Sequence, residues 1–320
     1  MDLLQPRRLG DLPLAVTPVG VGCAEIGSMA DTFGYDVPEE RAHAVVRAAL
    51  AGPLNFLDTA ASYGDGESER RIGQVLRELG GLPPGVVLTT KADRNLQTGD
   101  FSGAQIRRSV ERSLRLLGLE HLALVFLHDP EHTTFEAALG PGGPVEALQR
   151  LQQAGVVDHI GVAGGPIDLM VRYVETGLFE AAITHNRYTL LNRSAEPLVD
   201  VAAARRIPLL NAAPYASGLL ARGPDAGARY AYTDAPPDII SRARAMADVC
   251  QQYAVPLAAA ALQFSLREPR IAATIVGMSR PERIQQTLEL AAHPIPDEVW
   301  PQLDALAGPP VDPEAGRWQH

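Results

Sequence analysis

Eight short apolar runs, separated by turns and amphipathic helical stretches, constrain the fold of this chain more than any other feature. Most are continuously apolar rather than alternating, which is typical of strands buried on both faces of a parallel sheet. The sequence predicts strands at Val19–Cys23, Asn55–Asp58, Val86–Lys91, Leu122–His128, Val157–Val162, Ala181–His185, Ile207–Asn211 and Ile271–Val276. It predicts helices at Glu39–Ala51, Ser68–Leu79, Ile106–Leu117, Pro144–Ala154 and Ser194–Arg205.

Strands that alternate with helices form either a closed barrel or an open, doubly wound sheet. An open sheet that binds a dinucleotide usually has Gly-x-Gly-x-x-Gly after its first strand, and the stretch from Gly20 lacks the last glycine. Ser28–Val37 then has the pattern of a loop. We therefore expect an α/β chain of one domain, residues 1–320, folded as a (β/α)8 barrel. A hairpin over Arg8–Thr17 would precede it, and the long irregular stretch Ala212–Asp238 would lie over its catalytic face.

Charge and cysteine content restrict the partners of the chain. Its formal net charge is −10 and it has no block of Lys or Arg, which argues against nucleic acid and anionic membranes. Two cysteines, Cys23 and Cys250, are too few for a secreted disulfide framework. Met1–Gly10 has no signal-peptide core, and the longest apolar stretch, Val255–Leu266, is short for a membrane span. We expect a cytoplasmic protein that acts on a small molecule.

Four titratable side chains stand at or just after the ends of early strands: Asp58, Tyr63, Lys91 and His128. The carboxyl ends of barrel strands meet at one face, so these side chains should converge. A tyrosine ordinarily has a pKa of about 10, and a neighbouring ammonium group lowers it. We expect Lys91 to do this for Tyr63, Asp58 to hold Lys91 by an ion pair, and His128 to hydrogen-bond a substrate oxygen. Tyr63 would then be the general acid or base.

Each of these four residues alone has a more ordinary interpretation. Asp58 resembles a turn cap, Tyr63 a surface aromatic, Lys91 a solvated strand end and His128 a structural histidine. Only their combination favours catalysis. A metal site at residues 128–132 is not predicted, because Pro130 interrupts any helix that would present both histidines of that segment on one face.

The motif around Asp58 and Tyr63, Leu-Asp-Thr-Ala-Ala-Ser-Tyr-Gly, resembles the signature of aldo-keto reductases. Glu67-Ser68-Glu69 and Ile72-Gly73 continue it, and Lys91 and His128 fall where that family has its lysine and histidine. The resemblance runs from about Val19 to about Leu290. It implies an NAD(P)-dependent oxidoreductase with these four catalytic residues, since no side chain supplies a hydride.

Two further segments, His128–Glu131 and Asn186–Leu191, resemble the sugar 1-dehydrogenase branch of that family. The branch includes D-threo-aldose, L-fucose and L-galactose dehydrogenases, with a pyridoxal dehydrogenase nearby, and implies oxidation of an aldose at C1 to a lactone. A reductase of aldehydes or ketones, including pyridoxal-like ones, is the first alternative. A non-catalytic, cofactor-binding regulatory subunit, as in potassium-channel β subunits, is the alternative from another class.

The resemblance also implies where the cofactor binds. Asn186 falls where the family has an amide that binds the nicotinamide carboxamide, and Ser217-Gly218-Leu219 matches the loop at the pyrophosphate. Arg280 and Arg283 are available for a 2′-phosphate, which slightly favours NADP over NAD. The implied cofactor-binding residues are Gly22, Ala24, Asp58, Asn186, Ser217, Gly218, Leu219, Gly277, Ser279, Arg280, Arg283 and Gln286.

The sequence departs from the family pattern at several positions. Ala163-Gly164 replaces the usual Ser-Asn pair, and the aromatic residue that the family often stacks on the nicotinamide has no match near Ala212. Asp93 replaces the glycine usual in this branch, and Gly277 replaces a lysine common in NADP-selective relatives. For the substrate, Tyr215, Tyr230 and Tyr232 would suit an aromatic aldehyde, whereas Arg229, Asn211 and Asp93 would suit a sugar.

Overall fold

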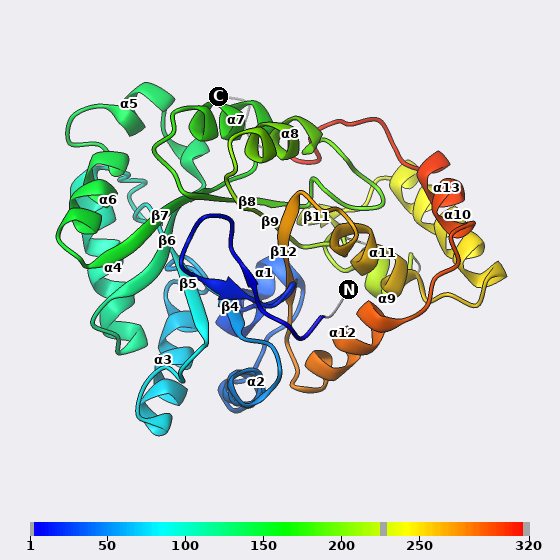
Figure 1. Ribbon diagram of the computed structural model, residues 1–320, viewed down its shortest axis with the longest axis horizontal. Coiled ribbons are helices and arrows are strands. Elements are labelled where there is room, and N and C mark those ends of the chain that lie inside the picture. The colour runs from blue at the N-terminus through cyan, green and yellow to red at the C-terminus, as the bar shows by residue number, and fades with distance from the viewer. Residues whose placement is uncertain (1–2, 225–228, 316–320) are drawn as a thin grey trace.

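A computed structural model describes residues 3–224 and 229–315 of the chain. Eight parallel strands close into a barrel, in which each strand pairs with the next along the chain and the last pairs with the first (Figure 1). The predicted (β/α)8 barrel is therefore confirmed. The barrel strands are β3 (Val19–Gly22), β4 (Phe56–Asp58), β5 (Val87–Ala92), β6 (Leu122–His128), β7 (Val157–Ala163), β8 (Ala181–His185), β9 (Leu209–Ala212) and β12 (Ile271–Gly277).

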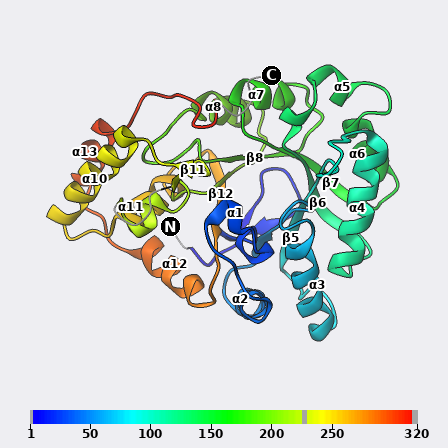
Figure 2. The same cartoon turned by 180° about the vertical axis from the view of Figure 1, so that it is seen from behind.

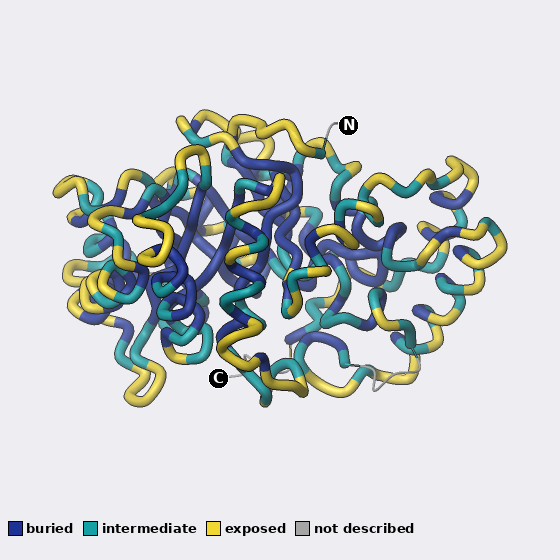
Figure 3. The backbone as a smooth tube through the Cα atoms, turned by 90° about the horizontal axis from the view of Figure 1, so that it is seen from below, coloured by how far each residue is buried: buried dark blue, intermediate teal, exposed yellow. Residues whose placement is uncertain are grey.

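Helices surround the strands and bury one face against them. Figure 3 shows the barrel strands mostly buried, whereas the outer helices alternate between buried and exposed residues. None of the helices in the described parts of the chain is long and apolar enough to cross a membrane. The longer helices are α2 (Glu39–Ala51), α3 (Glu67–Leu79), α4 (Gly103–Leu117), α6 (Pro144–Gln153), α7 (Ile167–Glu175), α8 (Glu196–Ala204), α10 (Pro237–Gln252), α11 (Leu257–Leu266) and α12 (Glu282–Ala292). The shorter ones are η1 (Glu25–Gly27), α1 (Ala30–Phe33), η2 (Pro130–His132), α5 (Phe135–Leu139), α9 (Leu219–Arg222) and α13 (Val299–Ala305).

A two-stranded hairpin covers one end of the barrel, as predicted. Its strands are β1 (Arg7–Arg8) and β2 (Ala15–Val16). Leu9 in the hairpin packs in one apolar cluster with Phe56 and Phe126 from inside the barrel. The hairpin lies in front of the strands in Figure 1, whereas α1 lies in front in Figure 2. The opposite end, where the strands finish, is therefore the end left for a site.

Two segments predicted to be irregular contain short regular elements. Ser28–Val37 includes α1, and Ala212–Asp238 includes α9 and the small hairpin of β10 (Arg229–Tyr230) and β11 (Thr233–Asp234). The helices α1 and α9 have four residues each. One helical turn is too short for a repeating apolar pattern, so the sequence gives no periodic signal there.

Candidate active site

The cavity at the carboxyl ends of the strands has a volume of about 1100 Å³. Residues immediately after β6 and β8 line it with left-handed backbone conformations: φ is 44° at Asp129 and 57° at Asn186. Residues with side chains rarely adopt this conformation, and such strain is common where a scaffold aims side chains at a ligand. The four predicted catalytic residues all line this cavity.

Three of those residues form one buried chain of hydrogen bonds. The Lys91 ammonium donates to Asp58 Oδ2 over 2.6 Å, to the Thr59 carbonyl oxygen over 2.7 Å and to the Tyr63 hydroxyl over 3.1 Å. Thr89 donates to the other Asp58 oxygen over 2.9 Å. Lys91 is 2% exposed and Asp58 3%, so water scarcely competes with their ion pair. The predicted Asp58–Lys91–Tyr63 contact is therefore present.

The effect on the pKa of Tyr63 differs from the expectation. Burial, reinforced by Asp58 and other carboxylates, raises the pKa of the Tyr63 hydroxyl well above its usual value. The prediction that Lys91 lowers it is wrong for this state of the protein. The main reason is burial of the hydroxyl, and Lys91 offsets it little because its charge is already paired with Asp58. Tyr63 therefore holds its proton at neutral pH.

His128 is placed by a second carboxylate. Its Nδ1 lies 2.8 Å from Asp93 Oδ1, and Ser62 Oγ lies 3.2 Å from the same nitrogen. Its Nε2 lies 3.6 Å from Asp129 Oδ1. The ring meets Tyr63 edge to face, with centroids 5.8 Å apart. Burial lowers the pKa of His128, but Asp129 and Asp93 outweigh it and raise that pKa overall.

Sequence reasoning underestimated Asp93. It noted the residue as an added charge near the site but did not connect it with His128. The signal was present, because side chains two apart on a strand share a face. Thr89, Lys91 and Asp93 have this spacing along and just after β5, and all three contact groups of the site. Asp129 and His185 also line the cavity. The sequence analysis considered Asp129 only within the segment His128–Glu131 and His185 only as the end of a strand, and gave neither a role in the site.

Nearly all predicted cofactor residues line the same cavity. The exception is Leu219, whose side chain is buried in the core at the start of α9. The helix end itself lies near the cavity through its neighbour Gly218. The residues placed as expected are Gly22, Ala24, Asp58, Asn186, Ser217, Gly218, Gly277, Ser279, Arg280, Arg283 and Gln286.

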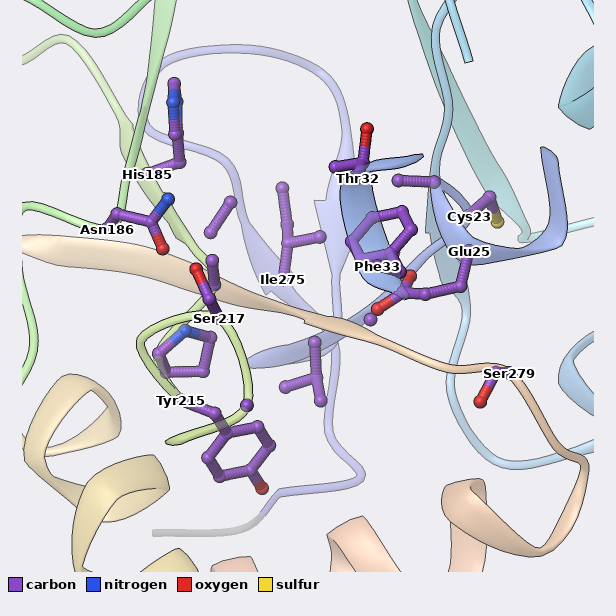
Figure 4. Close-up of a pocket in the computed structure, with 18 of the residues that line it drawn as sticks. Cys23, Glu25, Thr32, Phe33, His185, Asn186, Tyr215, Ser217, Ile275 and Ser279 are labelled. Atoms are coloured by element: carbon purple, nitrogen blue, oxygen red, sulfur yellow. The ribbon is translucent and has the colours of Figure 1, made fainter. Parts of the chain in front are cut away.

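Polar atoms in this part of the cavity have no partner in the protein. The amide nitrogen and oxygen of Asn186 are both buried without a hydrogen bond. Figure 4 shows Asn186 and Ser217 to one side of the pocket and Glu25 and Phe33 to the other. A buried amide with both ends unsatisfied matches a ligand amide such as the nicotinamide carboxamide. The residues present therefore fit a nicotinamide dinucleotide, with arginines toward its phosphates.

Among the residues considered for the substrate, both aromatic and polar side chains line the cavity. Tyr215, Tyr232 and Arg229 line it, from the segment after β9. Three other residues considered for substrate contact do not line it. Asn211 donates its amide hydrogens to the Tyr188 carbonyl and to Ser265 in the core, and Tyr230 is buried in the core. Asp93 lies behind His128 and contacts its Nδ1.

No set of three or more His, Cys, Asp or Glu residues suited to a metal ion occurs in residues 3–224 and 229–315. Cys23 and Cys250 are both buried free thiols.

Known proteins resemble the chain over nearly its whole length. The sequence model of the Aldo/keto reductase family matches residues 18–307. A D-threo-aldose 1-dehydrogenase from a Pseudomonas species is 32% identical, covering 91% of this chain and 94% of that protein. A pyridoxal 4-dehydrogenase from Microbacterium luteolum is 30% identical, covering 93% and 96%. An L-galactose dehydrogenase from Arabidopsis thaliana is 28% identical, covering 97% and 96%.

Among solved structures, an aldo-keto reductase from Bacillus halodurans in its holo form superposes with a TM-score of 0.77. It is 24% identical and covers 98% of this chain and 99% of that one, which supports the fold. The family match spans most of the barrel, including all four strand-end residues. The chain belongs to the aldo/keto reductase family.

Proposed function

We propose that this protein is an NAD(P)-dependent oxidoreductase that oxidises an aldose at C1 to a lactone, with Tyr63 as its general acid and base. One observation carries the proposal. The buried chain Asp58–Lys91–Tyr63 ends, beside His128, in the same cavity as the unsatisfied amide of Asn186. A proton carrier and a nicotinamide-sized hydrogen-bonding site therefore share one space.

Bound nicotinamide would accept or donate the hydride, and the protein's residues handle the proton. Tyr63 exchanges it with the substrate oxygen, and His128 holds that oxygen by a hydrogen bond. Lys91 keeps the Tyr63 hydroxyl in place over 3.1 Å and is itself fixed by Asp58. Because the pKa of Tyr63 is raised, the phenol is ready to donate in the reducing direction. In the oxidising direction it must first lose its proton, so aldose oxidation is expected to accelerate with rising pH.

The character of the relatives and of the cavity supports an aldose. Two of the relatives above are named for aldose or galactose oxidation. Asp129, His185 and Arg229 line the substrate end and offer both acceptors and donors. Hydroxyl groups of a sugar need such partners, because a buried hydroxyl without one is costly.

An aromatic aldehyde is the second candidate. Phe33, Tyr215 and Tyr232 line the cavity and offer flat apolar faces. The pyridoxal 4-dehydrogenase relative is named for a substrate of this kind. On this alternative the same proton carrier acts on pyridoxal-like substrates or reduces aldehydes and ketones with NADPH.

For the cofactor, Arg280 and Arg283 line the cavity beside Gln286. One arginine can bind two oxygens of a phosphate group at once, so these two arginines favour NADP, which has a 2′-phosphate, slightly over NAD. Gly277, in contrast, contributes no charge there.

The test follows nicotinamide absorbance with NAD and NADP for the oxidation of L-fucose, L-galactose, D-arabinose and pyridoxal, and with NADH and NADPH for the reduction of pyridoxal and benzaldehyde. The proposal expects the highest kcat/KM on an aldose. A preference for pyridoxal or benzaldehyde selects the second candidate. Cofactor binding without turnover on any of them would favour the non-catalytic regulatory role and reject both.

A further inference from the structure

Asp93 lies behind His128 and outside the main cavity. Its side chain is 4% exposed, and it lines a separate, smaller hollow with Ser62 and Arg94. One carboxylate oxygen accepts from the Ser62 backbone N–H over 2.9 Å, and the other lies 2.8 Å from His128 Nδ1. Both oxygens are therefore committed, and the carboxylate has no freedom to turn away.

The partners of Nδ1 decide where the protons of His128 lie. An ionised carboxylate only accepts hydrogen bonds, so the short contact with Asp93 requires a hydrogen on Nδ1. That leaves Nε2 as the nitrogen that faces the cavity, 3.6 Å from Asp129. A second carboxylate near Nε2 favours a hydrogen there too.

We propose, resting on the function above, that Asp93 is a positioning residue that together with Asp129 keeps His128 doubly protonated, with a charged Nε2–H toward the substrate oxygen. A charged donor binds a developing oxyanion more strongly than a neutral imidazole does. The division of labour follows: His128 stabilises charge on the oxygen, and Tyr63 alone exchanges the proton.

Other charged groups also lie around His128. Lys91, on the neighbouring face, opposes a second positive charge, but it is neutralised by Asp58 at 2.6 Å. Glu131, which also lines the cavity, has its pKa raised by burial to about 8 and is largely protonated at neutral pH. Burial alone would raise the pKa of Asp129, but the neighbouring His128 and His185 outweigh burial and lower that pKa overall. The two aspartates therefore dominate.

Asp93→Asn removes the negative charge of the carboxylate but leaves His128 a hydrogen on Nε2 to donate to the substrate oxygen. The Ser62 N–H can only donate, so it would hold the amide oxygen, and the amide NH₂ would face Nδ1. Nδ1 must then accept, which leaves a neutral ring with its hydrogen on Nε2. The pKa of His128 is expected to fall by about 1 to 3 units. If the enzyme is active, kcat/KM should fall about tenfold and its alkaline limb should move to lower pH by the same shift.

The measurement is an NMR titration of isotope-labelled histidine in the whole, substrate-free protein, with the His128 signal assigned by its loss in His128→Gln. Asp65→Asn is the matched control, because Asp65 is exposed and pairs with Arg112. It should leave the titration unchanged, and Asp93→Glu should restore part of the shift.

Two results overturn the proposal: a His128 in the unmodified protein that titrates at or below about 6.5, or an Asp93→Asn variant that titrates as the unmodified protein does. The first needs no variant, so it holds even if Asp93→Asn does not fold. Neither needs turnover, so failure here is distinct from failure of the aldose assay.

Discussion

The two halves of the cavity differ in how their buried polar groups are satisfied. In the half that holds Asp58, Lys91 and His128, each of these side chains is hydrogen-bonded to another side chain of the protein at 2.6 to 3.1 Å. In the half that holds Asn186 and Glu25, buried polar atoms have no partner in the protein. The first half is organised by folding itself, whereas the second is complete only when something binds. Each half should therefore respond differently to substitution.

The largest effect is expected from Tyr63→Phe. Removing the hydroxyl deletes the proton carrier but leaves the ring against His128 and the rest of the cavity in place. General acid–base groups contribute about 10²- to 10⁴-fold in rate, so kcat/KM should fall by that factor. Cofactor affinity, followed by quenching of protein fluorescence, should change less than about twofold. Turnover close to the original rate would reject Tyr63 as the proton carrier.

Next in size is the cost of breaking the ion pair in the organised half. Lys91→Met leaves Asp58 buried and unpaired, which should lower the free energy of unfolding by about 3 to 5 kcal/mol. Urea unfolding measures this. The double variant Asp58→Asn with Lys91→Met removes both charges and should recover much of the loss. A single variant as stable as the original protein would mean that Asp58 finds another partner or a proton.

The organised half was also the easier one to predict. Lys91 and His128 end strands whose apolar pattern is clear, and barrel topology brings strand ends together. Asp93 was harder: its spacing from Lys91 places it on the same face, just after β5, but the sequence does not show that it contacts Nδ1 of His128. The pKa of Tyr63 was mispredicted because sequence gives neighbours but not burial.

In the other half, the family pattern predicted which residues lie near the cofactor but not whether their polar atoms are hydrogen-bonded. It placed Asn186 near a cofactor, yet the amino-acid sequence does not show that both polar atoms of its amide lack a partner. It also missed Glu25, which stands in place of the last glycine of the incomplete motif and lines the cavity. The short helix α1 beside it was not predicted either, because a single helical turn has no repeating apolar pattern.

The third prediction separates ligand binding from stability in that half. Asn186→Gly suits the local φ of 57° and removes the unsatisfied amide. Cofactor affinity, measured by calorimetry, should fall by about 10- to 100-fold, because a bound amide loses both partners. The free energy of unfolding without cofactor should change by less than about 1 kcal/mol.

Asn211 gives the matched contrast, because its amide nitrogen already donates to the Tyr188 carbonyl oxygen and to Ser265 in the core. Asn211→Ala should destabilise the protein by about 1 to 3 kcal/mol and leave cofactor affinity nearly unchanged. If both variants instead lose stability equally, the amide of Asn186 is held by the protein and the comparison fails.

The smallest effect on cofactor affinity is expected at Glu25, whose carboxyl pKa is raised by burial from 4.5 to about 7. Between these values the folded protein binds a proton that the unfolded chain has released, so the unfolding free energy falls as pH rises and the loss is complete above about pH 7. Glu25→Gln removes that dependence. It should be close to the original protein near pH 5 and exceed it by about 2 to 3 kcal/mol near pH 8 in urea unfolding. Cofactor, which carries negative phosphates, should also bind a few-fold more tightly to the variant near pH 8 only.

Glu40→Gln on the exposed side of α2 controls for general loss of charge. An equal gain in unfolding free energy at both pH values would show that the ionised Glu25 carboxylate does not cause the pH dependence. The polar groups of this half of the cavity would then be no less well hydrogen-bonded than those of the other half.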